Sequence, residues 1–157
     1  MTVVAAERSG APPYEAYAAI VGVFVGGLGL AGLGARRFDR NPACQTGLDF
    51  VVLSAASFKA ARTLAHDEVT SFLREPFVQG AAHEGDEEPL ESGDFRQAIG
   101  ELVTCSRCGG TWAAAFLASA QILAPRFGRL LTWSLAAAGA NDFLQAAFAA
   151  LTRAAND

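Results

Sequence analysis

A long stretch without charged residues near the N-terminus constrains the fold of this chain more than any other feature. Residues 16–34 contain no Asp, Glu, Lys, Arg or His. A helix needs about 20 apolar residues to cross the hydrocarbon core of a membrane, within a range of about 17–25. We therefore predict a transmembrane helix over residues 16–34, preceded by an N-terminal tail over residues 1–15.

The residues beside this stretch orient it. Tyr14 and Tyr17 lie at its start, where amphipathic rings favour the headgroup layer. Three arginines follow its end: Arg36, Arg37 and Arg40. Such clusters stay on the cytoplasmic side, so we expect the N-terminus outside. A cleaved signal peptide is the alternative, but it has a positive N-terminal region, and here Arg8 is offset by Glu7.

Glycines recur along one face of the predicted helix. They are Gly22, Gly26 and Gly29, and the first two have G-x-x-x-G spacing. Such a face lets another helix approach closely. We expect self-association, or contact with another membrane protein, through this face. The alternative is that these glycines only reflect the ordinary composition of membrane helices.

The composition of the whole chain also indicates a membrane environment. Its 157 residues are 52% hydrophobic and 18% charged, whereas a soluble domain is about 45–50% apolar and about 25% charged. The formal net charge of -4 argues against nucleic acid, whose phosphates need a basic surface. The lipid bilayer is therefore the first partner that we expect, and nucleic acid is not one.

A second helix is predicted after residue 46. Thr46 and Asp49 have the spacing of a capping box, with Asp in place of Glu. The uncharged part, residues 50–58, is too short to span by itself, but Lys and Arg can snorkel to the headgroups, so we expect a tilted or partly interfacial span. The polar residues that follow share one face: Lys59, Arg62 and His66. This face is either solvated or a cationic surface for a partner or an anionic lipid.

The middle of the chain is more polar. Asp67 is expected to cap a short helix that ends before Pro76, because the residue before proline avoids helical geometry. Residues 79–92 are acidic and lack apolar periodicity, so we predict a mobile loop. Ser92 is expected to cap the next helix, which has an amphipathic stripe: Phe95, Ile99, Leu102 and Val103.

Two further apolar stretches follow, over residues 111–124 and 130–151. Trp112 lies at the start of the first, as an interfacial anchor would. Asp142 interrupts the second, where a charge at the membrane centre costs about 3 kcal/mol. Asp142 should therefore face the bundle, be protonated or pair with an arginine. It is either a functional residue or one that packs the helices through a hydrogen bond.

Together these patterns predict an all-α integral membrane bundle of about four helices, multi-pass in the bacterial cytoplasmic membrane. With four spans, the arginine-rich loops lie inside and the cysteines outside. With three spans, residues 36–107 are cytoplasmic, which the count of positive charges slightly favours. We choose four helices, because the cap at Asp49 favours a genuine inserted helix.

Cys105 and Cys108 form a C-x-x-C pair where a charged helix meets an apolar one. They are candidate ligands for zinc. A structural zinc site has four ligands, and the other cysteine and histidines of the chain that could complete it are Cys44, His66 and His83. A redox dithiol is the second interpretation, but the motif follows a helix that continues through it, and no thioredoxin-like pattern surrounds it. The third is simple packing or an inert disulfide.

An ordered set of residues resembles a known family. It runs from Leu48 and Asp49 through Arg62, Asp67 and Arg74-x-Pro76-Phe77 to Gly100-Glu101-Leu102 and C-x-x-C-x-G-x-W at residues 105–112. This set is similar to the YjcA-like family, small bacterial membrane proteins with a domain of unknown function that include a Bacillus sporulation protein. The likeness covers about residues 48–148, so we place the family domain at residues 46–153. No established activity is implied.

We expect a non-enzymatic scaffold or complex subunit of the bacterial cell envelope. The sequence has no nucleophile elbow, phosphate loop or H-E-x-x-H motif. The alternative is a membrane-embedded thiol-redox or metal-dependent enzyme that uses the cysteine pair. The other candidate site residues are His66, Asp67, Arg74, Glu101 and Asp142.

Overall fold

The protein is described by a computed structural model that covers residues 12–80 and 85–156, the side chain of Cys44 excepted. The described residues form helices joined by short connections, with one short hairpin, which confirms the all-α prediction. In chain order the elements are α1 (Tyr14–Arg37), η1 (Pro42–Cys44), α2 (Gly47–His66), η2 (Glu68–Thr70), α3 (Ser71–Arg74), η3 (Glu75–Phe77), β1 (Val78–Gln79), β2 (Glu88–Pro89), α4 (Phe95–Thr104), α5 (Ser106–Leu123) and α6 (Pro125–Asn156).

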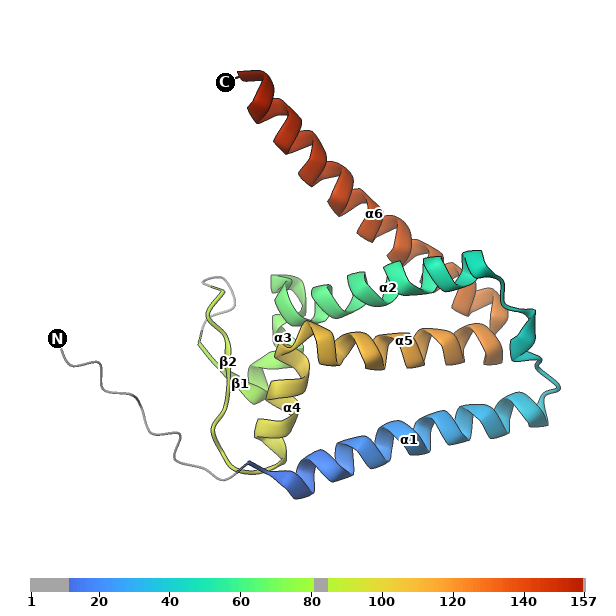
Figure 1. Cartoon of the computed structure of the whole chain (residues 1–157). Coiled ribbons are helices and arrows are strands. Elements are labelled where there is room, and N and C mark those ends of the chain that lie inside the picture. Colours follow the sequence, from blue (N-terminus) through green and yellow to red (C-terminus); the bar gives the residue numbers. More distant parts are fainter. Residues whose placement is uncertain (1–11, 81–84, 157) are drawn as a thin grey trace.

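Four long helices form the body of the molecule. α5 packs against α1, α2 and α6, and α2 packs against α6 as well. α1, α2 and α5 lie side by side, and α3, α4 and the hairpin gather at one end of them (Figure 1). Beyond its crossing with α2, α6 leaves the bundle, and residues 140–156 are exposed throughout.

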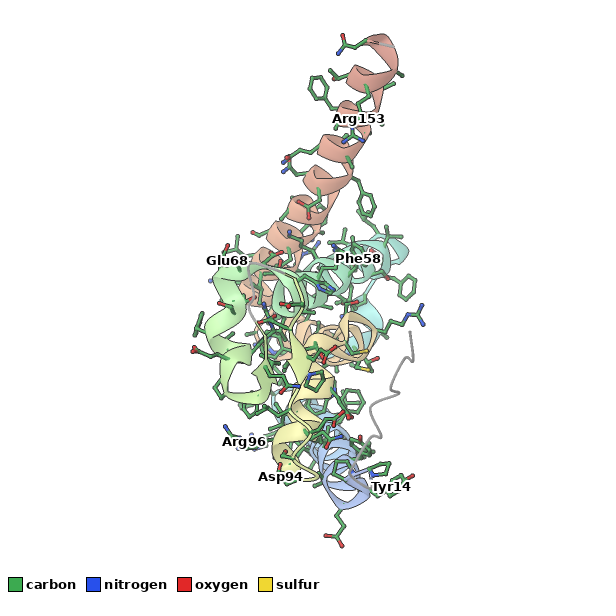
Figure 2. The ribbon with its side chains drawn as sticks, turned by 90° about the vertical axis from the view of Figure 1, so that its left-hand side faces the viewer. Tyr14, Phe58, Glu68, Asp94, Arg96 and Arg153 are labelled. Carbon is green, nitrogen blue, oxygen red and sulfur yellow. The ribbon has the colours of Figure 1, made fainter. Side chains whose placement is uncertain are left out.

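Seen from the end that carries α3 and α4, the molecule shows its polar elements in front (Figure 2). Tyr14, Glu68, Asp94 and Arg96 all lie at this end, whereas Arg153 lies far along the projecting part of α6. We call this the cysteine end, because α4 and α5 also join here at Cys105. The opposite end, where α1 leads into η1 and α5 turns into α6, is the arginine end.

α1 is, within residues 12–80 and 85–156, the one helix long and apolar enough to cross a membrane by length and composition. It extends beyond the predicted stretch at both ends. α2, α5 and α6 are of comparable length but carry more polar or charged residues. This test therefore supports one membrane-spanning candidate and does not support the predicted four-span, multi-pass bundle.

The start of α2 confirms the predicted capping box. The Thr46 hydroxyl accepts from the Asp49 backbone N–H at 3.2 Å, and the Asp49 carboxylate accepts from the Thr46 N–H at 2.9 Å. α2 then continues through Lys59 and Arg62 to His66. The uncharged part of this helix is thus the first half of a regular helix of 20 residues.

Three of the predicted capping or stop signals are wrong, although η2 begins directly after Asp67 and α3 ends at Arg74, as predicted. The Asp67 side chain makes no capping bond; its backbone carbonyl accepts from Thr70 instead. Glu75, which precedes Pro76, has helical angles (φ −43°, ψ −39°), because the chain continues as a tighter 3₁₀ turn past α3. The cap of α4 is Asp94, whose carboxylate accepts from the Arg96 N–H at 2.8 Å, while Ser92 only donates to Asp94.

The segment predicted as a mobile loop, residues 79–92, contains the ends of a hairpin. β1 and β2 pair antiparallel, with Val78 opposite Pro89 and Gln79 opposite Glu88. Gly80 follows β1 with a φ of 95°, a conformation that favours glycine. Residues 81–84, which include His83, lie outside the described residues. The loop is therefore tied at both ends to the cysteine end.

Small residues fill the interior of the bundle, and large apolar residues cover its outside. Among the described residues, the buried apolar side chains other than Val52 and Leu117 are alanines: Ala16, Ala35, Ala56, Ala61, Ala65 and Ala98. The exposed large ones come from every long helix and include Val21, Leu30 and Leu33 of α1, Phe50 and Val51 of α2, Phe116 of α5, and Leu130 and Phe143 of α6. This distribution is the reverse of that in an ordinary water-soluble bundle.

Candidate functional site

The cysteine pair lies at a break between two helices. α4 ends at Thr104 and α5 begins at Ser106, and Cys105 between them is extended (φ −92°, ψ 100°). Cys105 is the N-cap of α5, since its sulfur accepts from the backbone N–H of Cys108 at 3.3 Å. The prediction that one helix continues through the motif is therefore wrong. The cysteines occupy a helix N-terminus, where the dipole favours a thiolate.

The two thiols are free and in direct contact. The Cys108 thiol donates to the Cys105 sulfur at 2.7 Å. Hydrogen bonds from the Cys108 thiol and backbone N–H lower the pKa of Cys105, and the positive charge of Arg107 adds to this. Cys105 is therefore the first of the two to become a thiolate.

No third ligand completes a metal site among the residues that the structure describes. No group of three or more His, Cys, Asp and Glu side chains there is arranged to hold a metal ion. His66, at the end of α2, is exposed. The other two candidate zinc ligands, His83 and the side chain of Cys44, lie outside the described part. Zinc thus remains an expectation that rests on the cysteine pair alone.

Glu101, one turn before the cysteines, connects α4 to α1. Its carboxylate accepts from the Tyr17 hydroxyl at 2.5 Å and from the Gln97 side-chain amide at 2.9 Å. Tyr17, which we predicted as a headgroup anchor, is thus a hydrogen-bond donor to α4. It fixes the position of the helix that leads into the cysteines.

Arg74 is completely buried and acts as the hub of the polar end. Its Nη1 donates to the backbone carbonyls of Leu64 (2.7 Å) and Asp67 (3.1 Å) and to the Thr70 hydroxyl (2.9 Å). Its Nε donates to the Glu87 carboxylate at 2.7 Å, and Nη2 lies at the same distance from that oxygen, as an ion contact and not an aligned hydrogen bond. Arg74 therefore joins the end of α2, η2 and the hairpin.

Asp142 pairs with Lys59, not with an arginine. The Lys59 ammonium donates to the Asp142 carboxylate at 2.8 Å and lies 3.9 Å from Asp67. The helices approach closely here, because a Cβ on Gly139 would lie 3.3 Å from that of Lys59. The predicted polar stripe is thus divided: Lys59 faces α6, while Arg62 and His66 are exposed.

The predicted candidates therefore fall into separate groups. Cys105 and Cys108 have Glu101 beside them, Asp67 and Asp142 share Lys59, and Arg74 has Glu87. The pairings of Lys59 with Asp142 and of Glu87 with Arg74 were missed, and no local signal identifies them. The helix break at Cys105 had one signal, since Thr104 and Ser106 beside it are hydroxyl residues, which compete with the helix backbone for hydrogen bonds.

The arginine end has a polar pocket of about 340 Å³. Arg129 lies 3.5 Å from the Asp49 carboxylate, and the Gln45 amide donates to the buried Gln121 at 3.3 Å. The polar residues that line the pocket are these four together with Asp39, Arg40 and Asn41. The fold thus brings the cationic segments that follow α1 and begin α6 together at one end.

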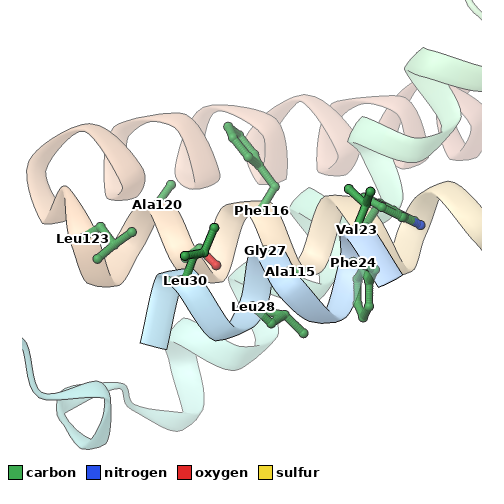
Figure 3. Close-up of a pocket in the computed structure, with 12 residues that line it drawn as sticks. Val23, Phe24, Gly27, Leu28, Leu30, Ala115, Phe116, Ala120 and Leu123 are labelled. Carbon is green, nitrogen blue, oxygen red and sulfur yellow. The ribbon is translucent and has the colours of Figure 1, made fainter. Parts of the chain in front are cut away.

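α1 leans against α5 along an open apolar groove of about 540 Å³ (Figure 3). Phe24 and Trp112 meet edge to face with ring centroids 5.1 Å apart. Trp112, predicted as an interfacial anchor, is therefore a contact between the two helices. The rest of the groove is lined by Phe116 and by small and aliphatic residues, including Gly27, Leu30, Ala115, Ala120 and Leu123.

Residues 52–148 match the family model described as "Protein of unknown function (DUF1360)". The chain belongs to this family. It is 36% identical over 104 residues to the sporulation protein YjcA of Bacillus subtilis (strain 168), covering 59% of this chain and 84% of the relative. It is 30% identical over 106 residues to the UPF0713 protein YngL of the same strain, covering 64% of this chain and 78% of the relative.

These comparisons confirm the resemblance that the sequence motifs indicated. The part of the chain that matches the DUF1360 family runs from α2 to α6 and includes the cysteine pair, Arg74 and Asp142. α1 lies before it. No solved structure matches the chain. Membership of this family therefore does not assign a biochemical function to the chain.

Proposed function

We propose that the chain is a multi-pass protein of the bacterial cytoplasmic membrane, in which α1, α2, α5 and α6 cross the bilayer, and that it acts as a non-enzymatic scaffold or complex subunit. One observation carries the proposal: small residues fill the helix interfaces, and large apolar side chains point outward. Membrane helices associate through small residues that allow close approach, while lipid solvates their large side chains.

The contrast is sharpest where α5 meets its neighbours. A Cβ on Gly109 would lie 3.8 Å from that of Ala61 in α2, and one on Gly128 would overlap the backbone of α5. Phe116 of the same helix is 62% exposed. In water, an apolar surface that continues over four helices would promote aggregation. In lipid it costs nothing, which supports the membrane setting.

The lengths of the helices suit the bilayer. At about 1.5 Å per residue, α1, α2 and α5 are about 36, 30 and 27 Å long, near the about 30 Å of the hydrocarbon core. α6, at about 48 Å, is long enough to cross at a tilt. The Lys59–Asp142 ion pair then neutralises two charges within the bilayer, as intramembrane charges require.

The two ends of the bundle have the charge asymmetry of a membrane protein. The arginine end carries five arginines: Arg36, Arg37, Arg40, Arg126 and Arg129. The cysteine end carries most of the carboxylates, on η2, the hairpin and α4. The rule that places arginine-rich loops inside puts the arginine end in the cytoplasm and the cysteine end outside.

The scaffold role is supported by an open helix face. A Cβ on Gly22, Gly26 or Gly29 would meet nothing within 4 Å in the structure, and α1 contacts α5 with another side, through Phe24. This glycine face is therefore free to receive a second helix, from another copy or another membrane protein. A helix that seats on it gains close backbone packing.

Replacing both Gly22 and Gly26 by Leu tests this role. The larger side chains hold a second helix away, so we expect association to weaken at least about tenfold, which is about 1.4 kcal/mol. Energy transfer between labelled copies in lipid vesicles measures it. Gly32→Leu is the matched control, since Gly32 is also open but is not part of the G-x-x-x-G pair. Equal association of the double variant, the control and the unaltered chain would contradict self-association through this face.

A further inference from the structure

The cysteine pair has a geometry that packing does not explain. A pair that only fills space is buried, but Cys108 is exposed and Cys105 is partly exposed. The other buried or paired polar groups of this end, Arg74 and Glu101, are bound to partners on other elements. The two thiols have their hydrogen bonds to each other and to the first turn of α5. They are therefore accessible, and among the described residues they have no hydrogen-bond partner on a distant element.

We propose that Cys105 and Cys108 form a thiol–disulfide exchange site that reacts with a disulfide, either in a protein or in a small molecule. This activity is independent of the scaffold role. Three geometric facts support it: Cys105 caps the N-terminus of α5, the two sulfurs are in contact, and Cys108 is exposed. A dithiol can give up two electrons within one chain, because its two thiols are oxidised together to one internal disulfide.

The reaction balances without a further reagent. The Cys105 thiolate attacks one sulfur of the incoming disulfide, forms a mixed disulfide and releases the other sulfur as a thiolate. The Cys108 thiol then loses its proton and attacks the Cys105 sulfur, which releases the second thiol. The pair is oxidised by two electrons, and the incoming disulfide is reduced by two.

The roles of the two cysteines follow from their positions. Cys105 receives two hydrogen bonds from Cys108, which stabilise a thiolate there and lower its pKa. Cys108 keeps its proton and donates it to the Cys105 sulfur, so it is the slower nucleophile toward an external disulfide. It is nevertheless 2.7 Å from Cys105, and closing to the about 2.05 Å of a disulfide needs a movement of less than about 1 Å.

The test uses the full chain in mild detergent, with Cys44→Ser in every variant so that thiols remain only at positions 105 and 108. The reduced protein is mixed with oxidised glutathione or with insulin, and the products are followed by mass spectrometry. We expect the dithiol chain to end as an internal disulfide without a retained adduct. Cys108→Ser should retain an adduct on Cys105, and Cys105→Ser should react at least about tenfold more slowly at neutral pH.

The two probes distinguish the sources of the disulfide. Faster reduction of insulin supports a protein disulfide, and faster reaction with glutathione supports a small one. Equal rates for Cys105→Ser and Cys108→Ser, or no reaction with either probe, would overturn the proposal. Zinc retained in stoichiometric amounts with both thiols protected from alkylation would also overturn it. Serine can cap α5 as cysteine does, and equal melting temperatures confirm that the variants fold.

Discussion

Replacing Arg74 by Met is expected to destabilise the protein by about 3–5 kcal/mol, because breaking a buried ion pair leaves an uncompensated charge. The Glu87 carboxylate is only 11% exposed and has two nitrogens of Arg74 as its partners. The carbonyls of Leu64 and Asp67 would lose a donor at the same time. Met preserves the aliphatic volume, so the loss isolates the guanidinium. The hairpin and η2 should separate from the end of α2.

Denaturant unfolding in detergent micelles measures this change. Arg96→Met is the matched control: Arg96 is exposed and donates to the Pro76 carbonyl, so its loss should cost about 0.5–1.5 kcal/mol at most. Arg74→Lys should restore little, because an ammonium cannot reproduce the forked contacts of a guanidinium. A cost for Arg74→Met no larger than that for Arg96→Met would show that Arg74 is not the hub of this end.

The substitution Gly128→Ala is expected to cost about 1–3 kcal/mol, the range for inserting a methyl group into a tightly packed interior. The added Cβ would overlap backbone atoms of Ala120 and Gln121, which lie in a helix and cannot rotate away. The first turn of α6 would have to shift away from α5. Because Arg129 follows directly, the pocket at the arginine end should change as well.

Thermal melting in detergent gives the measurement, with Gly32→Ala as control. Gly32 lies in α1, where an added Cβ meets nothing within 4 Å. Alanine there should be neutral or stabilise by up to about 1 kcal/mol, since it favours a helix over glycine. If both variants melt together with the unaltered chain, α5 and α6 are not packed as closely as described.

The features of the fold that depend on neighbouring residues were predictable from the sequence. The capping box at Thr46 and Asp49 involves residues three apart, and the structure shows it. The family resemblance, carried by Arg74, Pro76 and the cysteine motif, was also confirmed. In each case the sequence order itself contains the pattern.

The features that depend on distant residues were not predictable. Lys59 and Asp142 are 83 positions apart, and only the crossing of α2 and α6 brings them together. Glu87 lies in a segment that we predicted as a loop, although it holds the buried Arg74. The break at Cys105 is local, but a hydrophobic pattern on both sides conceals it. This break changes the chemistry, since it places the thiols at a helix N-terminus.

We propose that four helices cross the membrane with the arginine end inside. Labelling of single cysteines in intact cells tests this topology. The background carries serine at all three native cysteines, and the four test substitutions are Ala43→Cys, Ser92→Cys, Phe127→Cys and Ala154→Cys. A membrane-impermeant maleimide should label Ser92→Cys and Ala154→Cys in intact cells, and the other two only after the membrane is opened. If α1 alone crosses the membrane, Ser92→Cys and Ala154→Cys will stay unlabelled in intact cells, and the account is contradicted.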